Sequence, residues 1–387
     1  MLKDEVLFAW WTLSSTPGIG SIALNKIREQ LPTCSDLIEC SAQDLILFGL
    51  KAELAHSWAQ NNRRDSVSNP FLLSGWQQIQ TWCSQPGCGL LMPDDEDYPH
   101  SLKTLRDAPI FLFYRGNPQL LKQASIAIVG SRNPSHYGRE QAFTIAQQLV
   151  TSDWHVISGL AIGIDGEAHK GAMNNATGIG KGKTIAVLGS GLAEIYPKRH
   201  QGLAQQIVES GGLLVSEYLP NEKALAQNFP RRNRIVSGIS QGTLVIEAAL
   251  KSGSLITARL AAEQGREVFA LPGAVVNPLS RGCHQLIKDG ANLVESAADI
   301  LGLLNSDLAL SHDELALAEQ SDLFANPAIP RLDDLAQQVY DALDVIPTAI
   351  DSLVNRTGLT VADIAQQLIL MELKGQVSQV PGGYVRM

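Results

Sequence analysis

Several features are missing from the 387-residue sequence, and each absence narrows the class of protein. No apolar run reaches the roughly 18 residues that a membrane-spanning helix needs. The opening stretch MLKDEVLFAWWTLSS has acidic residues where a signal peptide has basic ones, so we interpret it as an amphipathic helix. The cysteines are scattered and odd in number, which predicts neither a disulfide framework nor a paired zinc site: Cys34, Cys40, Cys83, Cys88 and Cys283. We therefore expect a cytoplasmic protein without a membrane partner or a bound metal.

The composition is that of an ordinary globular protein, but its charge is unevenly distributed. Hydrophobic residues make up 45% and charged residues 18% of a chain long enough for two or three domains. The net charge of −9 argues at first against a nucleic-acid partner. Residues 111–301 hold 18 Lys and Arg against 14 Asp and Glu, whereas residues 1–110 hold 8 against 13. A polyanion could therefore bind the basic middle of the chain.

The amino-terminal part of the chain has helical patterns and almost no strand-like runs. Residues 1–90 predict a small helical domain, in which Pro17-Gly18-Ile19-Gly20 lies between two helical stretches. This turn resembles the hairpin of helix-hairpin-helix modules, although a structural hairpin is favoured over a DNA contact. Residues 91–110 are rich in turn-forming and acidic residues and predict a connection.

The middle of the chain alternates short Val/Ile/Leu-rich runs with amphipathic helical patterns. Over residues 111–301 the runs are FLFYRG, SIAIVGS, HVISGL, TIAVLGS, GLLVSE, TLVIEA and EVFALPG. Strands of this kind separated by helices are typical of a parallel sheet that is buried on both faces. The predicted fold class is therefore α/β, with an extended Rossmann-like, doubly wound and mainly parallel sheet.

The carboxy-terminal part predicts a linker followed by a second small domain. Residues 302–330 contain 5 acidic and no basic residues and end in prolines, which indicates an acidic linker, with room for one helix. Residues 331–387 show three helical patterns and then a strand pair around Pro381-Gly382-Gly383, the order of a winged-helix domain. Thr360, with Asp363 three residues later, predicts the cap of the third helix.

The stretch TGIGKGKTIAVLGSG at 177–191 resembles a phosphate-binding P-loop, but its spacing and context are wrong. The G-x-x-x-x-G-K-[ST] motif needs glycine where Thr177 stands, and Thr184 begins a strand instead of following one. GSGLAE at 189–194 has only the first two glycines of the dinucleotide-binding motif. We therefore expect no nucleotide cofactor, and we place Gly180 to Lys183 at the amino end of the strand, away from any ligand.

A more informative pattern lies where the predicted strands end, because open parallel sheets bind ligands beyond the carboxyl ends of their strands. Glycine and serine recur there, and glycines let backbone amides approach an anion. The residues of this predicted phosphate-binding rim are Gly130, Ser131, Arg132, Gly159, Gly163, Gly189, Ser190 and Gly191. Tight turns between strands and helices are the alternative, and Arg132 favours a site because its guanidinium would project over the rim.

Two loops add cations and aromatic rings to this rim. IYPKRH supplies Tyr196, Lys198 and Arg199, and NFPRRNRIVSGIS supplies Phe229, Arg231, Arg232, Asn233 and Arg234. Aromatic residues interleaved with cations suit a single-stranded nucleic acid, whose bases stack while its phosphates are neutralised. Three arginines at a helix start oppose the helix dipole, so a bound anion would explain them better than a solvated helix start.

Groups that could catalyse a reaction are few. Asp165 and His169 lie four residues apart on one helix face and could act together as a catalytic base or form half a metal site, but such a pair more often fixes a helix start and a loop. Glu217 follows a predicted strand, and Glu247 could be a crevice acid or a buried partner of the arginines. We assign these four residues no catalytic role.

The middle of the chain resembles the DprA/Smf family of DNA-processing proteins. The resemblance is carried by IAIVGSRNPSHYG, ISGLAIGIDGEAHKGAM, TIAVLGSGLAEIYPKRH, FPRRNRIVSGIS, EAALKSGSLITARLAAEQGREVFALPG and GCHQLIKDGANLV, in order through about residues 98–300. It implies a non-catalytic protein that binds and protects incoming single-stranded DNA and helps to load the RecA recombinase during natural transformation. It also implies a homodimer formed through the Rossmann-like domain.

The resemblance assigns DNA contacts to Arg132, in Gly-Ser-Arg, and to Lys198, in Tyr-Pro-Lys. His200 departs from the asparagine common in that loop, and NNATGIGKGK looks like an insertion. A nucleotide phosphoribohydrolase with a similar sheet is the alternative, although only part of its Pro-Gly-Gly-x-Gly-Thr-x-x-Glu motif is present. The third helix of the winged-helix domain holds Asp363 and Glu372 against Lys374 alone, so we expect this domain to contact protein, or to bind DNA only weakly.

Overall fold

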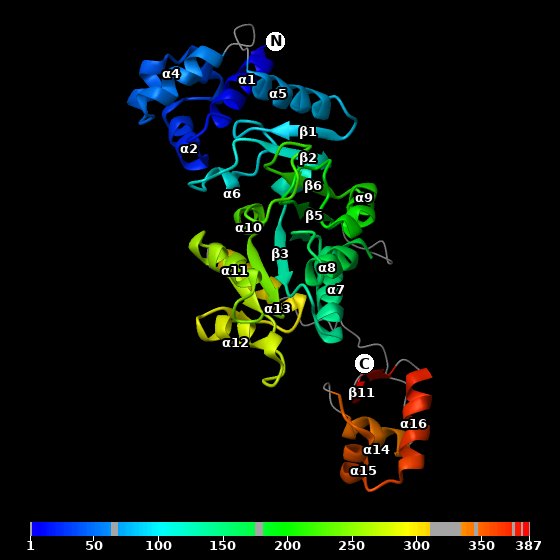
Figure 1. The fold of residues 1–387 in the computed structure, drawn as a ribbon. Helices are drawn as coiled ribbons and strands as arrows, with labels where there is room; N and C mark the ends of the chain where they lie inside the picture. The colour runs from blue at the N-terminus through cyan, green and yellow to red at the C-terminus, as the bar shows by residue number, and fades with distance from the viewer. Residues whose placement is uncertain are drawn as a thin grey trace. The chain divides into compact units, whose positions relative to one another are not determined.

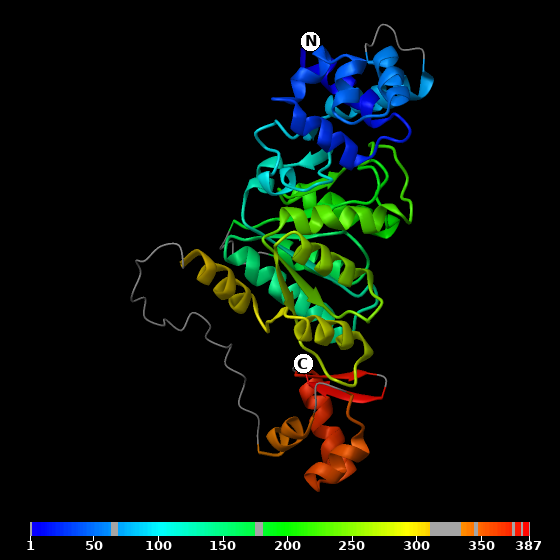
Figure 2. The same ribbon diagram turned by 90° about the vertical axis from the view of Figure 1, so that its left-hand side faces the viewer.

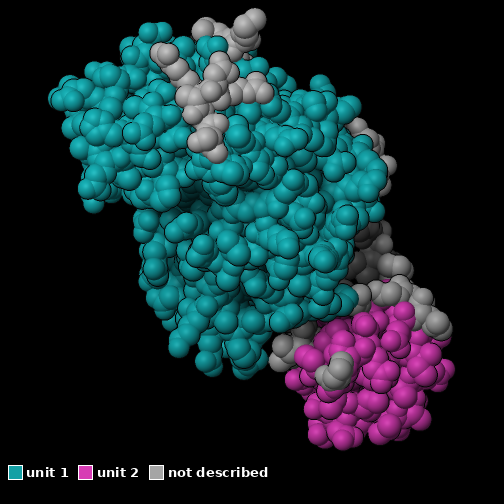
Figure 3. Space-filling model, turned by 45° about the horizontal axis from the view of Figure 1, so that its top comes forward, with its two compact units in different colours: residues 1–308 teal, residues 309–387 magenta. Residues whose placement is uncertain are grey.

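The chain folds into two compact units, residues 1–308 and 309–387, which Figure 3 distinguishes by colour. The computed structural model describes residues 2–62, 69–174, 181–309, 334–343, 347–373, 376–380 and 382–386. No helix within these ranges is both long enough and apolar enough to cross a lipid bilayer.

Unit 1 begins with a cluster of helices around buried tryptophans. The elements are α1 (Leu2–Ser14), α2 (Ser21–Gln30), η1 (Cys34–Glu39), α3 (Ala42–Leu47), α4 (Ala52–Asn61) and α5 (Pro70–Cys83). Trp10, Trp58 and Trp76 are buried among them, and the indole N–H groups of Trp10 and Trp58 donate to backbone carbonyls. The Pro-Gly-Ile-Gly turn joins α1 to α2, and Gly18 adopts a φ of 93° there, a value that suits glycine.

The sheet of unit 1 has nine strands in the order β1-β2-β6-β5-β4-β3-β7-β8-β9. They are β1 (Cys88–Leu91), β2 (Leu112–Gly116), β3 (Ser125–Gly130), β4 (His155–Ser158), β5 (Thr184–Val187), β6 (Leu213–Ser216), β7 (Gly242–Ile246), β8 (Glu267–Ala270) and β9 (Asn292–Leu293). The seven neighbouring strands β6-β5-β4-β3-β7-β8-β9 all pair in parallel, while β2 pairs antiparallel with β6. All seven strands expected from the sequence form, which confirms the mainly parallel sheet.

Two strands, β1 and the two-residue β9, are not among those expected from the sequence. Cys88–Leu91 lies where the sequence suggests only helices and a connection, yet it pairs antiparallel with β2, with Cys88 opposite Arg115. The run is only four residues long and is flanked by turn-forming and acidic residues. Its strand conformation therefore depends on the neighbouring strand, which local sequence does not reveal.

Helices cover both faces of the sheet, as a doubly wound fold requires (Figures 1 and 2). They are α7 (His136–Thr151), α8 (Ile164–Met173), α9 (Gln201–Glu209), α10 (Asn228–Ile239), α11 (Gly253–Glu263), α12 (Arg281–Lys288) and α13 (Ala297–Ala309), with the short elements α6 (His100–Lys103), η3 (Pro118–Lys122), η4 (Lys198–His200) and η5 (Pro278–Ser280). Adjacent strand residues serve opposite faces: Val156 packs in the core of α7, α8 and α13, and Ile157 in the core of α10, α11 and α12.

The amino-terminal helices share a core with one end of the sheet. Trp82 of α5, Phe113 of β2, Leu214 of β6 and Leu203 of α9 belong to the same buried cluster. Figures 1 and 2 show the blue helices at the β1–β2 end, away from yellow α12. This shared core fixes α5 relative to α9, a juxtaposition that creates a cavity described below.

The structure places Lys181 to Lys183 as the sequence predicts. The backbone N–H of Lys183 donates to Nδ1 of His155 at 3.1 Å, and the N–H of Lys181 donates to Asp153, so the segment lies at the amino ends of β4 and β5. Thr177 and Gly180 lie outside the described residues.

Unit 2 has the element order of a winged helix: α14 (Asp334–Ala342), α15 (Ile350–Thr357), α16 (Val361–Leu373), then β10 (Val377–Val380) paired antiparallel with β11 (Gly383–Arg386). The hydroxyl of Thr360 accepts from the N–H of Asp363 at 3.2 Å, which confirms the predicted cap of α16. Of the expected acidic linker, residues 302–309 continue α13, and residues 310–330 lie outside the described ranges.

Candidate nucleic-acid interface

A cavity of about 700 Å³ opens beyond the carboxyl ends of β3, β4, β5, β6 and β7. Its lining joins residues from five loops and from the starts of α10 and α11, which are distant in sequence. From the predicted rim it includes Gly130, Ser131, Arg132, Tyr196, Phe229, Arg232 and Asn233, together with Asp165. We call this the crest cavity.

The rim glycines owe their identity to close packing. A Cβ atom at Gly130 would clash with the carbonyl oxygen of Ile246, and one at Gly191 with that of Leu219. Gly163 has a φ of 87° and lies against the carbonyl of Ser131. Gly159 gives room to the Arg232 guanidinium and Gly189 to the ring of Phe229. The glycines therefore let the loops meet, in agreement with the tight-turn alternative.

The aromatic part of the rim is a pair of rings from different loops. Tyr196 is 51% exposed, and its ring centroid lies 5.3 Å from that of Phe229 at an interplanar angle of 48°. Both residues line the crest cavity. An exposed ring supported by a second ring offers a face on which a planar ligand can stack.

Four cations of the predicted rim remain exposed. They are Arg132 after β3, Lys198 and Arg199 in η4, and Arg231 at the start of α10. Ser190, in contrast, is buried and its hydroxyl donates to the carbonyl of Glu194 at 2.7 Å, so it presents nothing to a ligand. The exposed cations give this edge of the sheet a positive field.

The other two arginines of α10 have partners inside the protein. Arg232 is 5% exposed, and its Nη1 donates to the carbonyls of Gly159, at 2.7 Å, and Val187. Burial lowers the pKa of Arg232 to about 10, although Asp165 opposes that shift. Arg232 thus ties α10 to the ends of β4 and β5.

Arg234 is held by carboxylates. It is 7% exposed, Nη1 and Nη2 donate to Glu217 at 3.1 and 2.7 Å, and Nε donates to Asp107 at 2.9 Å. Burial lowers its pKa, but Glu217 and Asp107 outweigh burial and raise it. The interpretation that a bound anion explains all three arginines is therefore wrong for Arg232 and Arg234.

Asp165 and His169 have structural partners. Oδ2 of Asp165 accepts from the N–H groups of Gly159 and Ala161 at 3.0 and 3.3 Å, which fixes the loop after β4. Burial raises the pKa of Asp165, against Arg232 and the amide donors, which lower it. The described residues contain no cluster of three or more potential metal ligands.

His169 is a buried neutral imidazole. Thr184 Oγ1 donates to the carbonyl of Val156 at 3.0 Å, so Nδ1 of His169 is the donor in its 2.7 Å contact with Thr184. Burial lowers the pKa of His169 to about 3. Nδ1 of His200, the residue that departs from the family pattern, contacts the carbonyl of Leu160 at 2.9 Å.

Glu247 is neither a crevice acid nor a partner of the arginines. It is 4% exposed and has a φ of 51°. Its carboxylate accepts from the N–H and hydroxyl of Ser135, at 2.8 and 2.5 Å, and from Asn277 at 3.2 Å. Ser135 caps α7, so Glu247 joins the end of β7 to the start of that helix.

One part of the crest cavity lies outside the rim predicted from the sequence. Lys251, Ser252, Gly253 and Ser254 line it from the start of α11. Ser252 caps this helix, and the Ser254 hydroxyl donates to the carbonyl of Gly130 at 2.7 Å. A lysine in a Gly/Ser turn between a strand and a helix repeats the pattern of Gly130-Ser131-Arg132, and this repetition is the signal that could have identified it.

The sheet and the crest cavity define a Rossmann-like protein with a cavity lined by basic and aromatic side chains where its parallel strands end. The chain matches the family model of DNA recombination-mediator protein A over residues 89–305 and that of the DprA winged helix domain over residues 325–383. The chain therefore belongs to the DprA/Smf family.

Similar proteins are found both by sequence and by structure. Protein Smf of Escherichia coli is 45% identical over 306 residues, 79% of each chain. DNA processing protein DprA of Streptococcus pneumoniae is 46% identical over 207 residues, 54% of this chain and 71% of that protein. The X-ray structure of the S. pneumoniae protein superposes with a TM-score of 0.64 at 35% identity, covering 76% of this chain and 95% of that one. A Helicobacter pylori DNA processing protein A structure, described by its single-stranded DNA binding mode, gives 0.50 at 29% identity, with 57% and 96% covered.

Proposed function

We propose that this protein binds single-stranded DNA at the crest cavity. The observation that carries the proposal is the exposed Tyr196 ring, supported by Phe229, in a cavity that the exposed cations Arg132 and Lys251 also line. Bases stack on aromatic faces whatever their sequence, and cations neutralise the phosphates between them. A binding mode of this kind is sequence-tolerant and depends strongly on salt. The single-stranded DNA binding described for the H. pylori relative supports it.

In this proposal the rim residues divide into two groups by exposure. Arg132, Lys198, Arg199, Arg231 and Lys251 contact phosphates, and Tyr196 stacks on a base. Arg232, Arg234, Asp165 and Glu217 hold the loops in place through the contacts described above. Because the second group is already paired, the cavity needs little rearrangement before DNA binds.

Membership of the DprA/Smf family supports the wider role. We infer that the protein acts in the cytoplasm as a homodimer, protects incoming single strands and helps to load RecA onto them in natural transformation. We further infer that it does so without catalysis. The buried, fully paired Glu247 does not support a phosphoribohydrolase, whose reaction would need that carboxylate in the cavity.

The direct test is a titration of a fluorescent oligothymidylate across a salt series, with wild-type protein, Arg132→Ala and Arg139→Ala. Arg139 is an exposed arginine of α7 that does not line the cavity, so it controls for net charge. Arg132→Ala should weaken binding about fivefold or more and flatten the dependence on salt, because a phosphate contact is lost. Normal binding by Arg132→Ala at moderate salt would show that DNA binds elsewhere.

A further inference from the structure

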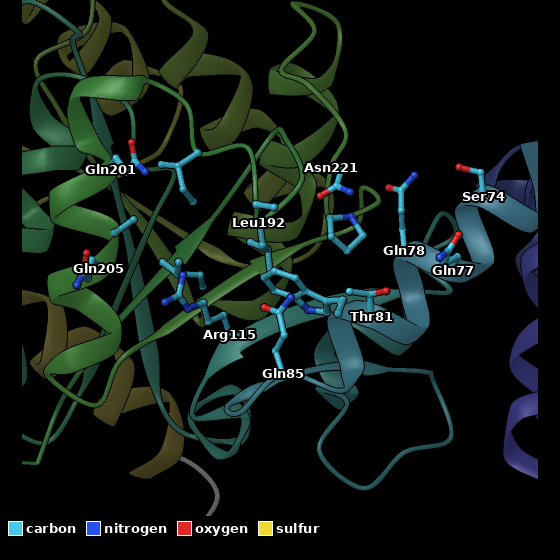
Figure 4. A pocket seen from close by; sticks show the side chains of 16 residues that line it. Ser74, Gln77, Gln78, Thr81, Gln85, Arg115, Leu192, Gln201, Gln205 and Asn221 are labelled. Atoms are coloured by element: carbon cyan, nitrogen blue, oxygen red, sulfur yellow. The ribbon is translucent and has the colours of Figure 1, made fainter.

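A second cavity, of about 510 Å³, lies between α5 and α9 in unit 1. Figure 4 shows side chains from both helices around it. Its floor is apolar and comes from the shared core: Trp82, Leu192 and Leu214 line it, and all three are buried. We call this the α5–α9 cavity.

The walls of the α5–α9 cavity are polar but nearly uncharged. Ser74, Gln77, Gln78 and Thr81 form a stripe on one face of α5, and Gln201 and Gln205 lie one turn apart on α9; Gln85 and Asn221 complete the polar lining. Each amide side chain offers both hydrogen-bond donors and an acceptor. Arg115 of β2 is the one cation among these described lining residues, and none of them is a carboxylate.

This combination fits a planar heterocycle that carries a phosphate. An apolar floor accepts a ring, neutral amides match the donors and acceptors along a base edge, and a single guanidinium pairs with one phosphate. The volume suits one nucleotide and falls within the roughly 300–1,000 Å³ of small-ligand pockets.

Two loops contribute residues both to the α5–α9 cavity and to the crest cavity. In the loop after β5, Ile195 lines the α5–α9 cavity while the next residue, Tyr196, lines the crest cavity. In the loop after β6, Pro220 lines the first and Ala226 the second. Backbone hydrogen bonds from Gly191 to Glu222, at 2.8 Å, and from Ala193 to Pro220, at 2.9 Å, join the two loops.

We propose that the α5–α9 cavity is a second nucleobase-binding subsite, which receives the single strand after it has passed Tyr196 and the cations of η4. This inference rests on the proposed function and extends the DNA-binding site from one cavity to two. An extended peptide could also lie between glutamine stripes. The two loops shared with the basic crest cavity and the lack of a carboxylate on the described lining favour the nucleic-acid strand.

The test compares oligothymidylates of about 6 and about 20 nucleotides, using full-length protein with Gln78→Ala and Gln205→Ala combined. The matched control combines Gln80→Ala and Gln206→Ala, exposed glutamines of the same two helices that do not line the cavity. We expect the cavity variant to bind the short oligonucleotide like wild type and the long one about fivefold more weakly, a loss typical of one stacked base. The control should bind both normally.

A second experiment tests whether the subsite binds the bases of the strand. Replacing the nucleotides beyond the first 6 or so by abasic ones should remove the affinity gained with length in wild type and change nothing in the cavity variant. Three results would contradict the subsite. The cavity variant and wild type could bind the long oligonucleotide equally, or an abasic extension could keep the full gain in affinity. The cavity variant could also lose saturable binding of thymidine monophosphate while neither protein gains affinity with oligonucleotide length. If wild type binds no single strand at all, the proposed function itself fails.

Discussion

The crest cavity lies where Rossmann-like sheets bind ligands and helix α16 lies where helix-turn-helix folds meet DNA, yet their surfaces differ in charge. The crest exposes Arg132, Lys198 and Lys251 beside an aromatic pair. The third helix of a winged-helix domain normally enters the major groove with basic residues. Here Val361–Leu373 contains two acids and no Lys or Arg, and it exposes Val361, Ile369 and Leu370 at 54%, 56% and 41%. We therefore expect the local field, more than the position in the fold, to decide which of the two surfaces contacts DNA.

Burial distinguishes two arginines of the crest that are three residues apart in sequence. Arg231 is exposed, whereas Arg234 is buried against Glu217 and Asp107. Arg234→Met should lower the free energy of unfolding of unit 1 by about 3 kcal/mol, because it leaves carboxylates without their partner. Arg231→Met should change it by less than about 0.5 kcal/mol. Urea unfolding followed by tryptophan fluorescence measures both, since all 6 tryptophans lie in unit 1; equal stabilities would show that the buried ion pair contributes nothing.

These arginines also show how far the sequence alone leads. The strand–helix alternation predicts the sheet because buried parallel strands need continuous apolar runs. The sequence also brings Arg132, Tyr196 and Phe229 to one edge, because the carboxyl ends of parallel strands coincide. It cannot tell Arg231 from Arg234, since burial depends on Glu217 and on Asp107, which is 127 residues away from Arg234 in the chain. The sequence does not predict the α5–α9 cavity either, because this cavity forms where two helices that are distant in the chain pack on one core.

Buried histidines should make unit 1 sensitive to acid, in contrast to residues 331–387, which hold none. Burial lowers the pKa of His155 to about 4 and that of His169 to about 3. In the unfolded chain both titrate near 6.5, so below this pH the unfolded state binds protons that the native state does not. The stability of unit 1 should therefore be complete above pH 7 and fall by about 2 kcal/mol by pH 5.5.

Tryptophan fluorescence in urea at a series of pH values measures this decline. His169→Asn, which keeps an N–H near Thr184, should reduce the slope by about half. Residues 331–387 contain no histidine, so unfolding of that fragment, followed by circular dichroism, should not change over the same window through this mechanism. A slope unchanged by His169→Asn would assign the acid sensitivity to other groups.

Two substitutions that change the net charge equally compare the crest with helix α16. Lys198→Gln in η4 and Gln366→Glu on the exposed side of α16 each change the charge of the chain by one unit in the same direction. Lys198→Gln should weaken binding of single-stranded DNA severalfold and reduce the slope of log K against log salt by about 0.7, the value for one phosphate contact. Gln366→Glu should leave both quantities unchanged, as measured by fluorescence anisotropy with full-length protein. Similar losses in both variants would mean that α16 contributes to binding.

The smallest expected effect concerns duplex DNA and unit 2 alone. Titration of a fragment of residues 331–387, which has its own buried core around Val339, Leu353 and Leu368, should show no salt-sensitive micromolar binding, because α16 offers no described cation to the groove. Adding lysines at Gln366 and Ile369, both exposed on α16, should create weak, salt-dependent binding if charge is what this helix lacks. Micromolar binding by the unmodified fragment would contradict the protein-contact hypothesis. Failure of the lysine variant to bind would mean that the shape of α16, and not its charge alone, excludes DNA.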